Sequence, residues 1–282
     1  MHHHELEDAR WRWPRLSLAL LIALIALGCS GRRGSERQRQ EQGASARGGG
    51  TLTVKGSDTM VILAQRWAEA FMEANEGVSV QVAGGGSGTG IAALINGTTD
   101  LANASRELKA RERTQIRERV GREAQQTRVA LDALAIYVHA ENGLASLTIP
   151  QLRGIFRGEI TNFREVGGPD LPIVIYSREN SSGTYAYFKE HVLDDLDFAP
   201  QAQTLPGTAA VINAIGQDRG GIGYGGIAYA AGVRAIRVAA EGGEAVEPTM
   251  QNATRGRYPL ARYLHIDSAG APEGLAARYL EF

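Results

Sequence analysis

Apolar residues along the chain alternate between two spacings from Thr51 onward. Residues 51–54 form a short β-branched run, whereas the apolar residues between Met60 and Phe71 recur at the spacing of a helix face. The predicted strands are 51–54, 78–82, 100–104, 131–138, 173–176, 221–224 and 235–239, and the predicted helices are 60–75, 91–95, 149–156, 184–193 and 209–215. This alternation predicts an α/β fold with parallel sheets.

Two stretches differ from this simple pattern. Leu131–Val138 is apolar enough to predict a strand buried on both faces within a parallel sheet. Residues 107–128 are mostly charged and polar, and we expect an exposed helix and loop there. A solvated face explains these charges better than a partner site does.

The first 28 residues have the pattern of a secretion signal. Three arginines precede the uncharged apolar run Leu16–Leu27, which has the length of a signal-peptide core and is short for a membrane span. The run ends in Ala26-Leu27-Gly28-Cys29, which resembles a bacterial lipobox. We therefore expect residues 1–28 to be a lipoprotein signal peptide and Cys29 to carry a lipid anchor, with plain secretion as the alternative. Residues 29–50 contain no large apolar residue and predict a flexible tether.

Composition and charge restrict the kinds of ligand. The 282 residues carry 30 Lys and Arg against 31 Asp and Glu, a formal net charge of −1, so the sequence lacks the basic excess of a nucleic-acid binder. A single Cys excludes an intrachain disulfide and a CxxC zinc site, and His139, His191 and His265 lack the spacing of a metal site. We expect no metal, no cofactor and no nucleic acid, and a local binding site instead.

Three predicted strand–helix junctions combine glycine with small hydroxyl residues. They are KGSDTM at 55–60, GGGSGTG at 84–90 and SRENSSGT at 177–184. Unsatisfied N–H groups and the helix dipole at such junctions suit a compact oxyanion, phosphate above all. Any one junction is better explained as an ordinary helix N-cap, and the second has neither the P-loop nor the dinucleotide pattern. Together, three junctions at the carboxyl ends of strands can converge on one crevice.

Five segments resemble a known protein family. They are TLTVKGSDTM, VAGGGSGTGIAALINGTTDLANASRELK, LTIPQLRGIFRGEITNFREVGG, YSRENSSGTYAYFKEHVL and GGIGYGGIAYA. In their order and spacing, the chain from residue 51 to its end resembles the phosphate-binding proteins of bacterial high-affinity phosphate ABC transporters. The resemblance implies a two-lobed α/β periplasmic-binding-protein fold, type II-like, in which each lobe is a mostly parallel sheet flanked by helices and hinge strands join the lobes.

The same resemblance implies how the chain is divided and what it binds. Lobe one is expected at 51–133 plus 238–282, and lobe two at 134–237. The expected partners are inorganic phosphate, an ABC transporter permease and, through the lipid anchor, a bacterial membrane. The resemblance predicts a monomer in the periplasm or at the cell surface.

Matching the family's motifs position by position implies a set of phosphate-binding residues. They are Ser57, Asp58, Thr59 and Met60 in the first junction, Ser87 in the second, Arg106 after the third strand, and Arg178, Ser182, Gly183 and Thr184 in the third junction. Because Arg178 precedes Ser182 by four residues, its guanidinium and that hydroxyl can reach one anion. The alternative for Arg178 is a surface salt bridge with Glu179 or Asp170.

One position departs from the family's pattern. Better-known members carry an Asp that accepts the proton of phosphate, and Arg106 stands at that place in Ala104-Ser105-Arg106-Glu107. Two arginines near the anion favour dianionic ligands, whereas a carboxylate restores the preference for protonated ones. The best substitute acceptor is Asp58, ahead of Asp100 and Glu107, although Asp58 is equally explained as a helix N-cap.

Two other functions remain open from the residues. A binder of another oxyanion, such as sulfate or molybdate, would use the same junctions. A phosphoester hydrolase would need Ser182 as a nucleophile, yet there is no GxSxG elbow, and His191 lies about two turns along the predicted helix. We therefore expect no enzyme activity.

Overall fold

The computed structural model describes residues 49–282. The predicted signal peptide, Cys29 and nearly all of the predicted tether lie outside these residues. Gly50, which was expected to end the tether, opens the first strand, β1 (Gly50–Gly56). Within residues 49–282, no helix is both long and apolar enough to cross a membrane.

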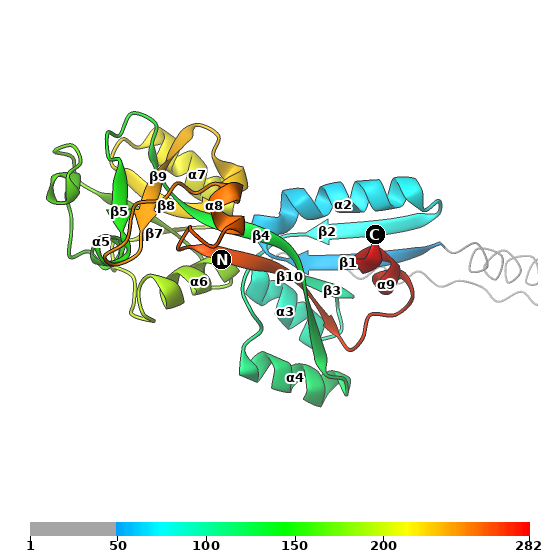
Figure 1. Ribbon diagram of the computed structural model, residues 1–282. Helices are drawn as coiled ribbons and strands as arrows, with labels where there is room; N and C mark the ends of the chain where they lie inside the picture. The colour runs from blue at the N-terminus through cyan, green and yellow to red at the C-terminus, as the bar shows by residue number, and fades with distance from the viewer. Residues whose placement is uncertain (1–48) are drawn as a thin grey trace, which may run out of the picture. The chain divides into compact units, whose positions relative to one another are not determined.

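The first half of the described chain, together with its C-terminal strand and helix, builds a sheet with helices on both faces (Figure 1). β1 pairs in parallel with β2 (Val78–Ala83) and β3 (Leu101–Ala104), and β10 (Ala261–Ala269) pairs antiparallel with β3. The associated helices are α2 (Val61–Ala74), α3 (Ser87–Ile95), α4 (Ala110–Val120) and α9 (Gly274–Glu281). Two core clusters follow from this layering, one that includes residues of α2 and α9 and one that includes residues of α3 and α4.

The second half builds another small sheet. β6 (Val174–Arg178) is parallel to β7 (Gln203–Leu205) and β8 (Gly221–Gly226), and β5 (Ser146–Thr148) is parallel to β9 (Val233–Ala239). The remaining helices are α5 (Ile149–Phe156), α6 (Gly183–His191), α7 (Thr208–Gln217) and α8 (Met250–Thr254). Short 3-10 turns are η1 (Asp58–Met60), η2 (Phe163–Val166) and η3 (Ile227–Tyr229).

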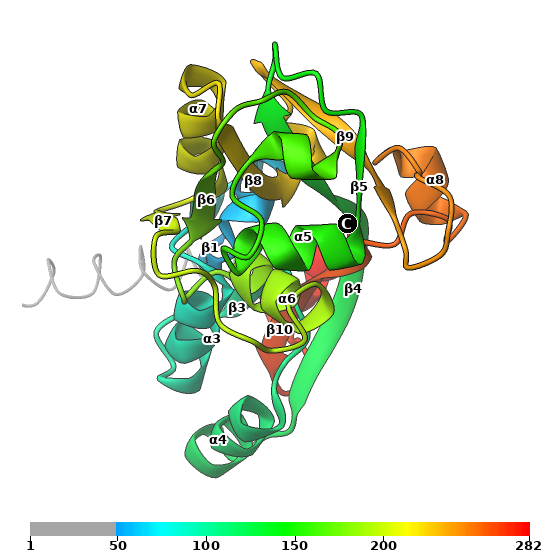
Figure 2. The same ribbon diagram turned by 90° about the vertical axis from the view of Figure 1, so that its left-hand side faces the viewer.

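One long strand, β4 (Ala124–His139), belongs to both sheets (Figures 1 and 2). Its residues 124–133 pair with β10, and its residues 134–139 pair with β8 and β9. The expectation of a parallel strand at Leu131–Val138 is wrong, because β4 is antiparallel to all three of these partners. Burial of 133–138 is as predicted; an apolar run indicates burial, but it carries no information on the direction of the neighbouring strand.

The largest core cluster belongs to the second sheet and contains a stack of aromatic rings. The rings of Phe188 and Tyr224 lie nearly parallel with centroids 4.1 Å apart. Ala253, Tyr258 and Leu260 pack in the same cluster, so the segment between β9 and β10 lies with the second sheet. The lobe boundaries at 133 and 238 stay a prediction. The packing of residues 253–260 on the second sheet favours a second boundary nearer to β10 than residue 238.

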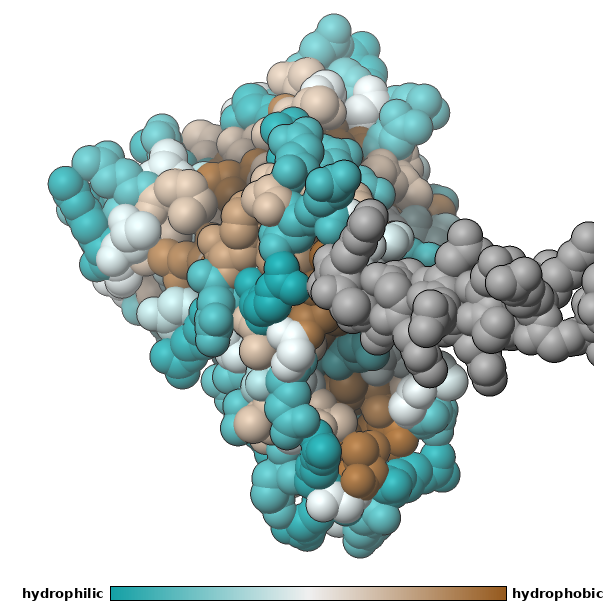
Figure 3. All heavy atoms as spheres, turned by 90° about the vertical axis from the view of Figure 1, so that its right-hand side faces the viewer, coloured by the Kyte–Doolittle hydropathy of each residue, from teal (hydrophilic) through white to brown (hydrophobic). Residues whose placement is uncertain are grey.

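Figure 3 shows the end of the first sheet where the described chain begins, and its surface is partly hydrophobic and partly hydrophilic. On that face, hydrophobic residues lie in patches between polar ones. Large hydrophobic side chains that are exposed in the described part of the chain are Ile62, Val120, Leu196, Met250, Tyr263 and Phe282. They lie on separate elements or loops and do not define a single site.

Candidate functional site

The structure brings the three glycine- and hydroxyl-rich junctions together. They follow β1, β2 and β6, and each leads into a helix or 3-10 turn. Gly86 N–H donates to the carbonyl of Gly56 at 3.0 Å, and Gly88 N–H donates to the carbonyl of Ser181 at 2.8 Å. The second junction is therefore hydrogen-bonded to both of the others, although its neighbour Ser181 is nearly 100 residues away in sequence.

Two glycines permit this close approach. A Cβ added to Gly183 would lie 2.3 Å from Ser87 Oγ and 2.7 Å from Ser105 Oγ. Gly86 has a φ of +91°, and a Cβ there would lie 2.6 Å from the carbonyl oxygen of Ser181. Any side chain at these positions would force the second and third junctions apart.

Buried hydroxyl groups line the meeting point. Thr59 Oγ1 and Thr184 Oγ1 lie 2.9 Å apart, and Ser87 Oγ accepts a bond from Ser105 N–H at 3.0 Å. Ser182 Oγ accepts from Tyr185 N–H at 3.2 Å, as the N-cap of α6. The side chains of Ser87 and Thr184 are fully buried, so their hydroxyl groups can serve a small ligand without competition from bulk water.

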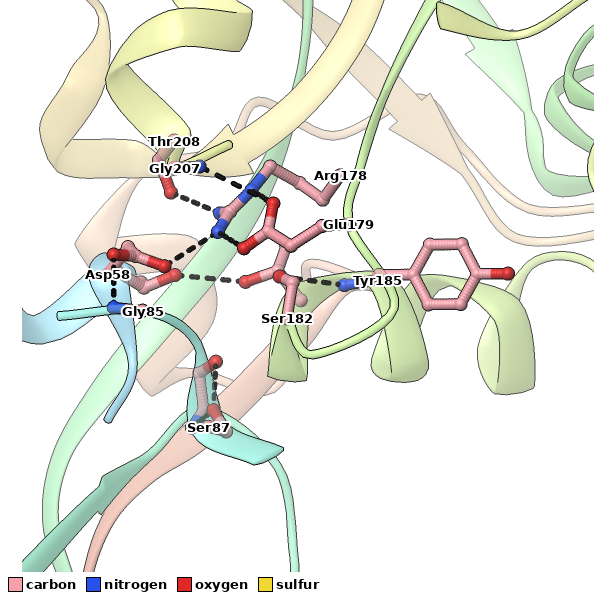
Figure 4. A network of polar contacts seen from close by, with 12 residues as sticks. Asp58, Gly85, Ser87, Arg178, Glu179, Ser182, Tyr185, Gly207 and Thr208 are labelled. Atoms are coloured by element: carbon pink, nitrogen blue, oxygen red, sulfur yellow. Dashed lines mark hydrogen bonds and ion pairs between the residues drawn. The ribbon is translucent and has the colours of Figure 1, made fainter. Parts of the chain in front are cut away.

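Arg178 is the largest fully buried side chain among the described residues. Figure 4 shows its guanidinium between Asp58, Glu179 and Thr208. Its Nε and Nη2 donate to the two carboxylate oxygens of Glu179 at 3.0 and 2.8 Å, and its Nη1 donates to Thr208 Oγ1 at 2.7 Å. Burial by itself raises the pKa of Glu179, but the hydrogen bond and charge of Arg178 outweigh it and hold that pKa below its usual value. The salt bridge with Glu179 is present, but its arginine is buried and its glutamate is only partly exposed, so it is not a surface pair; Asp170 pairs with Arg164 instead.

Asp58 joins the first junction to the third. Its Oδ2 accepts from Arg178 Nη2 at 2.9 Å, and its Oδ1 accepts from Gly85 N–H at 2.9 Å. Its carbonyl accepts from the Tyr229 hydroxyl at 2.7 Å. The alternative role as an N-cap is not seen, because neither η1 nor α2 has a side-chain cap.

The other two predicted residues of the first junction are engaged locally. Ser57 is buried, and its N–H donates to the carbonyl of Asn103 at 2.8 Å. Met60 N–H, the group expected to bind the anion, donates to the carbonyl of Ser57 at 3.0 Å, and the Met60 side chain lies in the core.

The guanidinium of Arg106 makes no hydrogen bond to the junctions, although the residue lines a small pocket beside the second and third of them. Its guanidinium makes two bonds to the carboxylate of Glu112, at 2.8 and 2.7 Å, and one to its neighbour's carbonyl. Asp100 caps the backbone of Thr53, away from the junctions, and Glu107 is exposed. Arg106 and Glu107 line an open groove of about 1170 Å³ bounded by α6 and β10.

Sequence reasoning missed a buried ion pair beside the junctions. Arg262 of β10 donates to Asp132 of β4 from Nε at 3.1 Å and from Nη2 at 3.0 Å, and its Nη2 also lies 2.9 Å from Thr184 Oγ1. A signal was available: Asp132 interrupts an otherwise apolar strand, and Arg262 lies in a segment with Leu260 and Leu264 on either side.

The charges around the site nearly cancel. Two guanidinium groups and three carboxylates contribute: Arg178, Arg262, Asp58, Glu179 and Asp132. Binding of an anion therefore depends on directed N–H and O–H groups more than on net positive charge. Among residues 49–282, no group of three or more His, Cys, Asp and Glu side chains is arranged to hold a metal ion.

Nothing around Ser182 prepares it as a nucleophile. Its oxygen accepts a backbone N–H, and the imidazole of His191 is bonded through Nδ1 to the carbonyl of Tyr187 at 3.0 Å. Nucleophilic catalysis needs a general base within hydrogen-bond reach of the hydroxyl. None of the hydrogen bonds within the described residues supplies one.

Comparisons with known proteins agree with this geometry. Residues 41–282 match the PBP superfamily domain. The chain is 35% identical over 250 residues to the phosphate-binding protein PstS of Pseudomonas aeruginosa, which covers 82% of this chain and 77% of that protein. It is 31% identical over 273 residues to the phosphate-binding protein PstS of Bacillus subtilis, with coverages of 95% and 88%.

Solved structures show the same relation. A putative phosphate ABC transporter substrate-binding protein with bound phosphate from Clostridium perfringens is 28% identical, with a TM-score of 0.73 over 82% of this chain and 92% of that one. An ABC-type phosphate transport receptor from Vibrio cholerae is also 28% identical, with a TM-score of 0.65. The predicted two-lobed α/β fold is confirmed, and the chain is of the class of two-lobed substrate-binding proteins. It belongs to the PBP superfamily and, within it, to the family of phosphate-binding proteins PstS.

Proposed function

We propose that this chain is an extracytoplasmic receptor that binds inorganic phosphate and delivers it to an ABC permease. The observation that carries the proposal is the convergence of buried hydroxyl groups on Thr59, Ser87 and Thr184 beside the buried guanidinium of Arg178. The relatives reported above, which are named for phosphate binding and phosphate transport, support the same ligand.

The proposed ligand set follows the geometry of the three junctions. Thr59 and Ser87 hold the anion from the first lobe, and Arg178, Ser182, Gly183 and Thr184 hold it from the second. Asp58 orients Arg178 and stands as the carboxylate nearest to the anion. Arg106 is left out of this set, because its guanidinium is paired with Glu112.

Binding is coupled to closure of the two lobes. We place lobe one at 51–133 plus β10 and α9, and lobe two at 134–237 together with the segment between β9 and β10 that packs on it. The bonds between Asp58 and Arg178 and between Thr59 and Thr184 join residues of different lobes. An anion bound by the same groups has a higher affinity for the closed arrangement and therefore stabilises it. A permease can then distinguish the closed receptor from the open one.

The location and partners in this proposal rest on the N-terminal sequence as well. Cleavage before Cys29 and lipid attachment there would anchor the receptor to the outer face of a bacterial membrane, beside its permease. Mass spectrometry of the mature protein from bacterial membranes tests this step: we expect an N-terminal diacylglyceryl cysteine at Cys29. A mature N-terminus at any other residue contradicts the anchor.

Isothermal titration tests the ligand directly. Protein freed of co-purified anion is titrated with phosphate, arsenate, sulfate and molybdate. We expect phosphate to bind at micromolar or lower concentration and sulfate to bind more weakly. Millimolar phosphate affinity together with tighter sulfate or molybdate binding contradicts the proposal, and so does turnover of a chromogenic phosphomonoester that Ser182→Ala abolishes.

A further inference from the structure

Arg262 lies where the strands that join the two lobes meet the candidate site. It is paired in register with Asp132 across β10 and β4, and each residue is only 5% exposed. Its Nη1 donates to the carbonyl of Ser105 at 3.0 Å, and its Nη2 donates to Thr184 Oγ1 at 2.9 Å. One guanidinium therefore contacts both connecting strands, the end of β3 in lobe one and the first turn of α6 in lobe two.

A guanidinium can only donate hydrogen bonds, and this decides what Thr184 does. A hydroxyl group both donates and accepts, so its direction depends on its neighbours. Because Arg262 fills an acceptor position of Thr184 Oγ1, the hydroxyl proton of Thr184 is available to an acceptor on its other side. On that side, in this structure, Thr59 Oγ1 lies at 2.9 Å.

Two other hydroxyl groups of the site are arranged in the same way. Ser87 Oγ accepts from Ser105 N–H, and Ser182 Oγ accepts from Tyr185 N–H. Each of these oxygens accepts a hydrogen bond from a backbone N–H, which leaves its hydroxyl proton available to an acceptor in the site. At Thr184 alone among the three, the N–H comes from a side chain and can be changed by substitution.

Asp132 allows Arg262 to be buried without an excess positive charge. Both bonds from Nε and Nη2 reach the same oxygen, Asp132 Oδ2. A buried guanidinium without such a partner is strongly destabilising. With it, Arg262 acts on the site through the direction of its N–H groups and not through net charge.

We propose that Arg262 is a positioning residue that holds the Thr184 hydroxyl as a hydrogen-bond donor toward the bound oxyanion. This inference rests on the proposed function, in which Thr184 contacts phosphate. Arg262 itself is anchored by Asp132 between the connecting strands, so the hydroxyl points correctly only when the two lobes hold their closed arrangement.

A double-mutant cycle tests the proposal by titration with phosphate. Arg262→Met weakens binding roughly tenfold, the effect of one well-directed buried hydrogen bond. Thr184→Val also weakens binding, and Arg262→Met adds no further loss in the Thr184→Val background. Arg262→Lys, which retains a donor, recovers part of the affinity. Arg128→Met is the matched control. The guanidinium carbon of this exposed arginine lies 4.5 Å from the ring centre of Tyr263, which is on β10 like Arg262, and Arg128 has no hydrogen bond to the site.

The outcomes separate the possible failures. Additive losses in the cycle overturn the inference, since Arg262 would then act independently of Thr184. If Arg262→Met does not fold, Asp132→Asn/Arg262→Met removes the ion pair without leaving an unpaired charge, and the same cycle is run on it. A wild-type protein that fails to bind phosphate overturns the proposed function instead, whereas normal wild-type binding with no effect of Arg262→Met overturns this inference alone.

Discussion

In the proposed function, Arg178 is the residue on which anion binding depends most. Glu179, Thr208 and Asp58 hold its guanidinium in one orientation, so that little conformational entropy is lost when a ligand binds. Loss of this group removes a charge-assisted donor and leaves two carboxylates facing the anion.

Arg178→Ala should weaken phosphate binding about 100-fold or more, as expected for a buried charge-assisted contact. Isothermal titration of the variant measures this. Arg164→Ala is a matched control, since Arg164 pairs only with Asp170 on the surface, and it should bind like the wild type. Equal affinities of the Arg178 variant and the control would contradict the assignment of the third junction.

Gly183→Ala tests the close approach of the second and third junctions. The added Cβ would collide with Ser87 Oγ and Ser105 Oγ, and closure would be prevented or displaced. We expect at least a tenfold loss of phosphate affinity, roughly the effect of one lost buried contact, with a melting temperature that changes little. Gly143→Ala, where a Cβ meets open space, is the control. Unchanged phosphate affinity in Gly183→Ala would show that the junctions need not touch.

The sequence indicated the site residues that lie on short contiguous motifs. The three junctions were predicted because each follows a strand and starts a helical turn, where local spacing is informative, and the family resemblance then implied Thr59, Ser87, Ser182 and Thr184 within them. Arg262 and Asp132 could not be placed in the same way, because the approach of β10 to α6 depends on tertiary packing. The position of Arg106 likewise depends on Glu112, whose carboxylate competes for the guanidinium.

At the scale of elements, segments with a clear apolar pattern were predictable, whereas several very short or mixed ones were not. Helices such as α2 and α5 agree closely with their apolar spacing. The short elements β5, β7 and α8 leave too few residues for a periodicity to be seen. β10 was missed because its buried face carries His265 and Asp267, so that its pattern does not read as apolar.

That polar face of β10 makes stability depend on pH. Asp267 is fully buried; its Oδ1 accepts from Gln126 Nε2 at 2.7 Å, and its Oδ2 has no partner among the described residues. Burial raises the pKa of Asp267 to about 7, against the opposing effects of Gln126, Arg106 and Arg113. The folded protein therefore holds this proton more tightly than the unfolded chain does, and its stability falls as pH rises from about 4 to about 7.

Asp267→Asn should remove this dependence. The free energies of unfolding of wild type and variant should agree near pH 4, and the variant should be more stable above pH 7, by about 4 kcal/mol at most. Urea unfolding at a series of pH values measures the difference. The exposed Asp170→Asn serves as the control. A constant difference between Asp267→Asn and wild type across this range would contradict the assignment.

At the scale of the whole molecule, several direct bonds hold the two lobes together. Asp58 to Arg178, Thr59 to Thr184 and Gly88 to Ser181 cross between them beside the site, and the Tyr187 hydroxyl donates to the carbonyl of Ala261 at 3.1 Å. These contacts come from segments far apart in sequence. The place of the junctions at the carboxyl ends of strands and the family resemblance both indicated that the junctions would meet, whereas the contact between Tyr187 and Ala261 was not predicted.

Closure driven by ligand can be seen in solution. Small-angle X-ray scattering should give a smaller radius of gyration for the wild type in saturating phosphate than without it, because the anion adds bonds to the closed arrangement. Asp58→Asn, which weakens the direct bond to Arg178, should expand the phosphate-free protein further. Identical scattering of the wild type with and without bound phosphate would contradict the coupling of binding to closure.

In the proposed function, one phosphate is held where the three junctions meet. A crystal structure of the phosphate complex tests it most directly. The anion should lie within hydrogen-bond distance of Thr59 Oγ1, Ser87 Oγ, Thr184 Oγ1 and the Arg178 guanidinium, enclosed between the lobes. An anion bound instead in the open groove beside Arg106, with these four groups uninvolved, would contradict the account.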